Sequence, residues 1–173
     1  MMDEAEFWEL IDTTRQAAEG DAEEQADLLL DRLTQLDPEA VTDFARHFEA
    51  RFHRAYQWDL WAAAWILLDG ASDDVFDSFR AWLIGQGRTV FEGAAHEADS
   101  LAELLEDFDE ELDGEAEDLR FVADDAYEQL TGVELPELGV PDPPDEPQGL
   151  PLDLEEEKEL ATRLPRLWDR FGY

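Results

Sequence analysis

Apolar side chains recur at intervals of three and four residues along most of the chain, which is the spacing of one face of an α-helix. The clearest stripe joins Val41, Phe44, Ala45, Phe48 and Phe52. The same spacing occurs in five other segments: Phe7–Ile11, Leu28–Leu36, Val75–Leu83, Leu101–Leu105 and Leu119–Leu130. No segment shows the two-residue alternation of a half-buried strand. The pattern predicts an all-α fold.

The segment Leu60–Leu68 is apolar on every side rather than on one face. Such a helix must be covered all round, so we expect a single compact domain of about seven to nine helices wrapped around it. Large aromatic side chains nearby should share its core, namely Trp61, Trp65, Phe79 and Trp82. The segment is too short to cross a bilayer, because a membrane-spanning helix needs about twenty apolar residues.

Polar residues mark where two of these helices should begin. Asp37 followed by Pro38 is typical of an N-cap with proline at the first helical position. Ser72 is a favourable N-cap for a later helix. Asp73 and Asp74 then fall in its first turn, where the helix dipole favours negative charge.

The composition changes towards the C-terminus, where six of the eight prolines lie between residues 133 and 151. Closely spaced prolines block both helix and sheet, so this segment should be an extended arm. An apolar stripe returns at Leu160, Leu164 and Leu167, and Pro165 should kink or restart the helix there. We predict a helical core domain over residues 1–132, a Pro-rich arm over 133–152, and a C-terminal helix over 153–173 that packs back on the core.

The net charge of −35 at pH 7 narrows the choice of partners. It disfavours direct binding of nucleic acid or of an anionic membrane, because both need a positive face. It suits a basic protein partner, and the run Glu97–Asp118, with twelve acidic residues and no basic one, suits mimicry of a nucleic acid. General solvation of a soluble protein is the simpler explanation of the charge. Because the chain has no cysteine and its acidic start does not resemble a secretory signal, we expect a cytoplasmic protein.

Motifs for metal chemistry are incomplete. His47 and His53 lie six residues apart and point to different faces of a helix. His96 begins a zinc-protease motif that lacks its second histidine. Asp109–Gly114 resembles the first half of an EF-hand loop, but Arg120 stands where the closing glutamate should be. We therefore assign no catalytic residue, no cofactor and no metal site.

Two groups of charged residues remain as candidates. Five of the 12 basic residues form the first: Arg46, Arg51, Arg54, Arg80 and Arg88. Guanidinium groups bind phosphate or carboxylate through paired hydrogen bonds, but internal pairing with the more numerous carboxylates is the simpler explanation. For Arg80 we expect a partner among Asp59, Asp73 and Asp74.

The second group is a set of aspartates that could act in acid–base chemistry or hold magnesium: Asp59, Asp69, Asp73, Asp74 and Asp77. Three of them open predicted helices, where the helix dipole already favours an anion. The dipole therefore explains most of this group without a site.

Three blocks within residues 4–132 are distinctive: Phe7-Trp8-x-Leu10-Ile11, Ala55-Tyr56-x-Trp58-Asp59-Leu60-Trp61-Ala62-Ala63, and Ser72-Asp73-Asp74-x-Phe76-x-x-Phe79-Arg80-x-Trp82-Leu83-Ile84 with Gly87-Arg88 after it. In these blocks the chain resembles an uncharacterised bacterial family, domain of unknown function 4240 (DUF4240). The resemblance implies a compact helical domain with no assigned activity, so no catalytic residue is carried over. It singles out one cluster, which is either functional or a set of polar clamps between helices: Trp58, Asp59, Asp73, Asp74, Arg80, Trp82 and Arg88.

The leading functional hypothesis is a non-enzymatic protein-interaction or regulatory module that uses an acidic face. The alternative is a small-ligand-binding or enzymatic domain with a pocket framed by Trp58, Asp59, Asp73, Arg80 and Arg88. A nucleic-acid mimic is the third possibility. Geometry separates the first two, because an enzyme needs its polar groups to converge on an accessible cleft.

Overall fold

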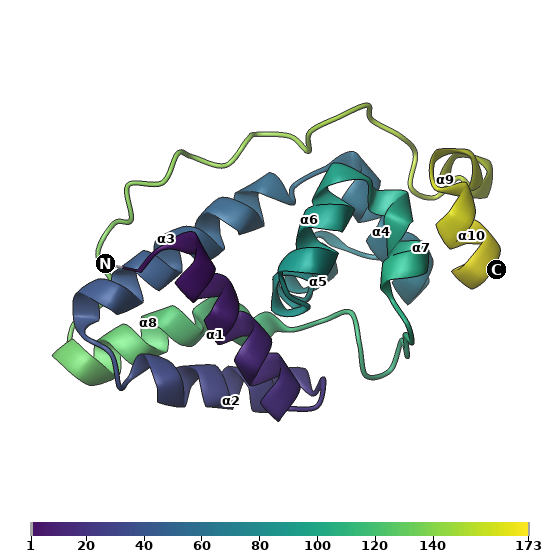
Figure 1. Ribbon diagram of the computed structural model, residues 1–173. Helices are drawn as coiled ribbons and strands as arrows, with labels where there is room; N and C mark the ends of the chain where they lie inside the picture. The colour runs from purple at the N-terminus through teal and green to yellow at the C-terminus, as the bar shows by residue number, and fades with distance from the viewer. Residues whose placement is uncertain (1, 173) are drawn as a thin grey trace.

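The structure, a computed structural model, describes residues 2–172 and consists of helices joined by short turns and one long arm (Figure 1). Within that range no strand forms, apart from an isolated bridge between Gln57 and Gln148. The all-α prediction is confirmed. The elements are α1 (Glu4–Ala17), α2 (Ala22–Leu33), α3 (Pro38–Arg54), α4 (Trp58–Leu68), α5 (Asp73–Gly85), α6 (Arg88–His96), η1 (Ala98–Ser100, a 3₁₀ turn), α7 (Leu101–Leu104), α8 (Glu117–Thr131), α9 (Glu157–Arg163) and α10 (Pro165–Phe171).

Aspartate N-caps start the first three helices, Asp3, Asp21 and Asp37, each accepting a hydrogen bond from the backbone N–H three residues on. Pro38 occupies the first turn of α3, and Ser72 Oγ caps α5 through the N–H of Val75 at 3.3 Å. Both predicted helix starts are therefore confirmed. These caps fix helix boundaries because they satisfy backbone donors that have no partner inside the helix.

The centre of the fold is α5, which contacts α1, α3, α4, α6 and α8. Nine of its thirteen residues are buried. The Leu60–Leu68 helix is covered on several sides, because α4 contacts α5, η1, α9 and α10 and six of its eleven residues are buried. The expectation that it is the central helix, covered all round, is wrong in that α5 has more neighbouring helices and that Trp61 and Trp65 of α4 are only half-buried. Trp61 lies along the surface, where its Nε1 donates to the carbonyl of Ala71 at 2.9 Å.

The two remaining aromatic residues of the predicted core are buried, with Phe79 at 0% and Trp82 at 3% exposure. A continuous apolar run in the sequence does not distinguish a fully buried helix from one whose outer side carries half-buried indole rings. Both indoles still pack against the core, so they shield it without entering it.

A bundle of α2, α3 and α8 lies beside α5 (Figure 1). Within it, α8 contacts α2 and α3, and it also contacts α5. The helix predicted from Leu101 onwards is shorter than expected and ends at Leu104. Arg170 of α10 donates to the carbonyls of Ala102 and Leu105 at this end, which stabilises a helix that stops there. Residues 105–116 then form an irregular acidic loop.

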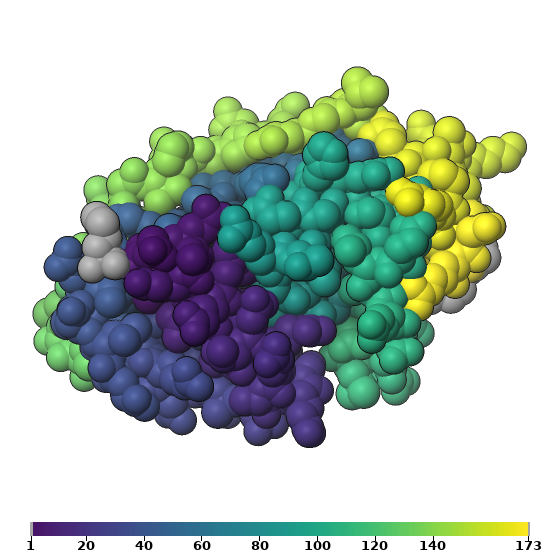
Figure 2. Space-filling model, viewed as in Figure 1, coloured from purple at the N-terminus to yellow at the C-terminus, as the bar shows by residue number. Residues whose placement is uncertain are grey.

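The arm runs without helix from the end of α8 to α9, and Figure 2 shows it as a ridge along one edge of the molecule. It is fastened at few points, including Gln148, which exchanges backbone hydrogen bonds with Tyr56 and Trp58 at 2.9 Å each. Beyond it, Pro165 divides the C-terminal helix into α9 and α10, so residues 2–172 form ten α-helices where about seven to nine were expected. Residues 1 and 173 of the predicted domain ranges lie outside the described residues.

Candidate functional site

The cluster singled out from the sequence does not converge on one pocket. Asp59 Oδ1 accepts a hydrogen bond from Arg163 at 2.7 Å, on the side where α9 docks. Arg88 lies 3.6 Å from Glu4, on the side of α1. These two residues are thus bound to different elements of the fold.

Three further members of the cluster have local roles. The Trp58 ring stacks on Trp61 at 5.8 Å. Asp73 and Asp74 lie exposed in the first turn of α5, behind the Ser72 cap, as their position in the sequence indicated. They complement the helix dipole there and form no salt bridge within the described chain.

Arg80 is enclosed, with 7% of its side chain exposed. Its Nη2 lies 2.5 Å from Asp77 Oδ1, and its Nη1 donates to the carbonyl of Phe52 at 2.9 Å. The guanidinium also lies over the rings of Phe52 and Tyr56, at 3.9 and 4.8 Å from their centroids. Burial lowers the pKa of Arg80 from its usual value, and the bond to Asp77 opposes that shift.

The expected partners of Arg80, Asp59, Asp73 and Asp74, are wrong. A carboxylate of the same sequence block does pair with it, but it is Asp77, which lies three residues before Arg80 and so on the same side of α5. Because Arg80 crosses between α5 and α3, this network holds two helices in register and acts as a polar clamp.

One cleft, of about 940 Å³, lies between the body and the arm segment Leu135–Pro144, and it includes Asp73 and Arg80. Arg80 and Arg120 both reach into it, and both lie against Asp77, at 2.5 and 3.5 Å. Both arginines of this cleft are therefore already paired with a carboxylate of the chain.

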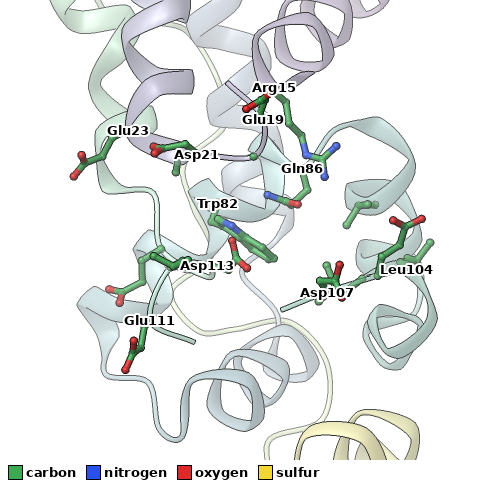
Figure 3. Close-up of a pocket in the computed structure, with 17 residues that line it drawn as sticks. Arg15, Glu19, Asp21, Glu23, Trp82, Gln86, Leu104, Asp107, Glu111 and Asp113 are labelled. Carbon is green, nitrogen blue, oxygen red and sulfur yellow. The ribbon is translucent and has the colours of Figure 1, made fainter. Parts of the chain in front are cut away.

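A second cleft, here called the acidic cleft, has a volume of about 920 Å³. It is bounded by the turn between α1 and α2, by the end of α5, and by residues 104–115 (Figure 3). Eight carboxylates line it: Glu19, Asp21, Glu23, Glu106, Asp107, Glu111, Asp113 and Glu115. Arg15 is the one basic residue in this lining.

Salt bridges do not neutralise the carboxylates of the acidic cleft, and Arg15 is a single positive charge among eight negative ones. None of the eight forms a salt bridge with a described residue, and Arg15 forms none either. Two of them serve local turns, since Asp21 caps α2 and Asp113 accepts from the N–H of Asp109 at 3.0 Å. The cleft therefore has a strongly negative potential, which low-dielectric walls focus.

Trp82 forms the apolar floor of the acidic cleft. Figure 3 shows its indole ring between Asp113 on one side and Asp107 and Leu104 on the other. The ring packs edge-on against Phe108 at 5.6 Å between centroids. The residue is only 3% exposed, but its Nε1 is not one of the fully buried polar atoms, and it donates no hydrogen bond to any residue between 2 and 172. The indole N–H therefore reaches the cleft without a partner and can donate to a ligand.

The three arginines of α3 are paired internally, as expected: Arg46 with Asp43 at 2.8 Å, Arg51 with Glu4 at 2.9 Å, and Arg54 with Glu92 at 2.7 Å. They therefore form no open anion site.

In the described chain no group of three or more histidine, aspartate or glutamate side chains is placed to hold a metal ion. Asp109 and Asp113, from the segment that resembles an EF-hand, close a tight turn on themselves, with Asp109 Oδ1 accepting from the N–H of Glu111 at 3.0 Å. None of the helices in residues 2–172 has both the length and the hydropathy of a membrane span.

The sequence interpretation missed the arginines of the C-terminal helices. Arg166 binds Asp99 at 3.1 Å, and its hydrogen bond to Asp99 raises its pKa above the usual value. The available signal was composition, because four of the 12 basic residues fall between residues 158 and 170.

A family model described as "Protein of unknown function (DUF4240)" matches residues 2–129, from the start of the first helix into α8. The match leaves out the arm, α9 and α10. No curated protein and no solved structure matches the chain. The chain therefore belongs to the family DUF4240, as the sequence blocks around Trp58 and Arg80 indicated.

Proposed function

We propose that this protein is a non-enzymatic interaction module and that its acidic cleft docks a lysine- or arginine-rich segment of a partner protein. One observation carries the proposal: eight carboxylates without a salt bridge surround Trp82, whose indole N–H has no partner. An ammonium or guanidinium group is attracted by such a negative field. The indole N–H can donate to a backbone carbonyl of the docked segment.

The chain itself supports this chemistry. Several arginines of the chain pair with carboxylates, as Arg54 does with Glu92 and Arg163 with Asp59. In the acidic cleft the carboxylates lack such a partner, because Arg15 is the one described basic residue of the lining and it forms no salt bridge. A cation supplied by another molecule completes the same pairing.

Nucleic-acid mimicry has weaker support, because the run Glu97–Asp118 is divided between two surfaces. Glu97, Asp99 and Glu103 bind Arg166 on one side, and the segment after them lines the acidic cleft. A mimic needs its charges displayed along one continuous face. The pocket alternative has weaker support as well, since Asp59 and Arg88 lie on different sides of the fold.

The test uses a fluorescein-labelled peptide of alternating lysine and glycine as the probe, titrated by anisotropy at 50 and 300 mM sodium chloride. We compare wild type with Glu23→Gln/Asp107→Asn/Glu111→Gln, which removes three exposed charges of the cleft and leaves the Asp21 cap intact. The matched control is Asp27→Asn/Asp31→Asn/Glu128→Gln, three exposed acids outside the cleft.

We expect the cleft variant to weaken peptide binding by about tenfold and the control variant by much less, because local pairing exceeds the long-range effect of net charge. Equal losses of peptide affinity in the two variants would show that the peptide responds to the overall charge of the protein and does not bind the cleft. Trp82→Phe should weaken binding without loss of the fold, because phenylalanine keeps a ring but lacks the N–H.

A further inference from the structure

The C-terminal helices occupy a groove of their own, here called the α10 groove, formed by α4, η1 and α7. Asp99 lies at its centre and is 7% exposed. Its carboxylate accepts hydrogen bonds from the backbone N–H groups of Arg166 and Leu167, at 3.1 and 2.9 Å, and from Arg166 Nε at 3.1 Å. One acidic side chain thus anchors both the backbone and the cationic side chain of α10.

The two arginines of α10 lie four residues apart and bind along one side of the groove. Arg166 bridges Glu97 at 2.6 Å and both oxygens of Glu103 at 3.1 Å. Arg170 binds the carbonyls of Ala102, Leu105 and Glu106. The sites are complementary to a helix with positive charge at positions i and i+4.

Apolar side chains of the C-terminal helices fill the bottom of the groove. Leu160, Leu164 and Leu167 are 2%, 2% and 0% exposed. Leu160 and Leu167 project from two helices of only seven residues each, and Leu164 is the residue between them. A helix this short does not persist alone in water, so α10 is helical because the groove orders it.

The groove and its occupant belong to different parts of the chain. Every groove residue named above lies within residues 2–129, which match the family, and the occupant lies beyond that range. About 25 residues without helix, including the arm, join α8 to α9 and can span roughly 75 Å when extended. The occupant is thus a tethered ligand, and its tether supplies an effective concentration of the order of millimolar.

We propose that the α10 groove is a docking site for a basic amphipathic helix, that α10 is its resident ligand, and that a partner helix with an Arg-Leu-x-x-Arg pattern displaces α10. The ion pairs at the rim are open to exchange, since Glu97 and Glu103 are 61% and 58% exposed and Arg166 is 42% exposed. Exposed pairs of this kind give specificity and little stability. The inference does not depend on the acidic cleft, whose lining excludes Glu97, Asp99 and Glu103.

The test measures binding of a labelled peptide of residues 155–172 to the full chain by fluorescence anisotropy. In wild type the tethered α10 competes, so we expect weak binding. In Arg166→Ala/Arg170→Ala, here called the latch variant, the resident ligand is weakened, and we expect the peptide to bind at least tenfold more tightly. The control peptide carries glutamate in place of both arginines and should not bind.

A second experiment, on the wild-type protein, applies if the latch variant does not fold. A protease site placed at residues 143–146 of the arm of the wild-type protein allows cleavage after folding, and the labelled peptide should then replace the severed C-terminal fragment. Failure of the peptide to bind the folded latch variant and to exchange into the cleaved protein would overturn the proposal. A dimer that swaps α10 between copies, seen by light scattering without peptide binding, would also overturn it.

The proposals for the acidic cleft and for the α10 groove can be tested independently of each other. The cleft variant Glu23→Gln/Asp107→Asn/Glu111→Gln should bind the helical peptide as wild type does, and Asp99→Asn in the latch variant should abolish that binding while leaving the lysine–glycine peptide bound. If the cleft variant lost both peptides and Asp99→Asn lost neither, the groove would not be the binding site of the helix.

Discussion

The acidic cleft and the α10 groove are built from neighbouring parts of one acidic run, yet only the groove is neutralised. In the groove Asp99 is 7% exposed and binds Arg166, whereas in the cleft exposed acids such as Asp107 surround Trp82 without a salt bridge. The difference lies in which of the chain's few arginines can reach each surface. Acidic residues in similar sequence surroundings thus contribute differently to the stability of the fold, because their partners are distant along the chain.

The largest expected effect concerns the floor of the cleft. Trp82→Ala removes a side chain that is 3% exposed and packed against Phe79 and Phe108, so it should lower the free energy of unfolding by about 3–5 kcal/mol. Urea unfolding followed by circular dichroism measures this. The control is Trp65→Ala, where a half-buried ring should cost clearly less. Equal unfolding midpoints for wild type and Trp82→Ala would mean that the cleft floor is not part of the core.

The next largest effect is expected from the same substitution made in the α10 groove and in the acidic cleft. Asp99→Asn removes the charge that accepts three hydrogen bonds from Arg166 and Leu167, and should cost about 2 kcal/mol. Asp107→Asn makes the same chemical change in the open cleft, where no cation is lost, and should leave stability unchanged or slightly raised. If the two variants unfolded at the same urea concentration, the contrast between an occupied and an open acidic surface would be lost.

The residue pattern predicted the features that depend on neighbours along the chain. The caps at Asp37 and Ser72 and the helix break at Pro165 depend on residues within one turn, and all are confirmed. Features that depend on distant partners were not accessible. Arg80 was assigned to the correct sequence block but not to Asp77, and the role of Arg166 was missed, because its partner Asp99 lies 67 residues away.

The candidate site shows the same limit. Trp82 was singled out from its sequence block, but nothing in that block indicates that Asp21 and Asp113 lie around it. Those residues come from two other segments, and folding alone brings the three together. A cleft assembled from separate segments has no contiguous motif, and so the family resemblance pointed to its floor and not to its walls.

Salt should stabilise the protein, because unpaired carboxylates repel one another in the folded state. The melting temperature should rise with sodium chloride from very low ionic strength, as screening shortens the repulsion to about 8 Å near 0.15 M. Mild acidification should also stabilise at first, and stronger acid should reverse the gain when paired carboxylates lose their charge. The cleft variant Glu23→Gln/Asp107→Asn/Glu111→Gln should show a shallower salt response than wild type. A flat response in wild type would mean that the acids of the cleft do not repel one another appreciably.

The smallest expected effect concerns two acids whose pKa values shift in opposite directions, Glu4 and Asp124. Hydrogen bonding to Arg51 lowers the pKa of Glu4, so its stabilisation is present at neutral pH and is lost as pH falls through the lowered pKa. Burial raises the pKa of Asp124, with Asp125 and Glu49 adding to the shift, so its folded form favours the proton and its destabilising effect grows as pH rises above 3.8.

Glu4→Gln should therefore lower the melting temperature at pH 7, and Asp124→Asn should raise it. Both differences from wild type should vanish in strong acid, where each carboxyl group is protonated in the folded and the unfolded chain alike. The measurement is a melting series from pH 8 to pH 2 on the two variants and wild type. Shifts of the same sign in the two variants at pH 7 would show that total charge governs stability, whereas opposite signs would show that each acid is governed by its own partner. Opposite signs would show that the contrast between paired acids in the α10 groove and unpaired acids in the acidic cleft also holds for single residues.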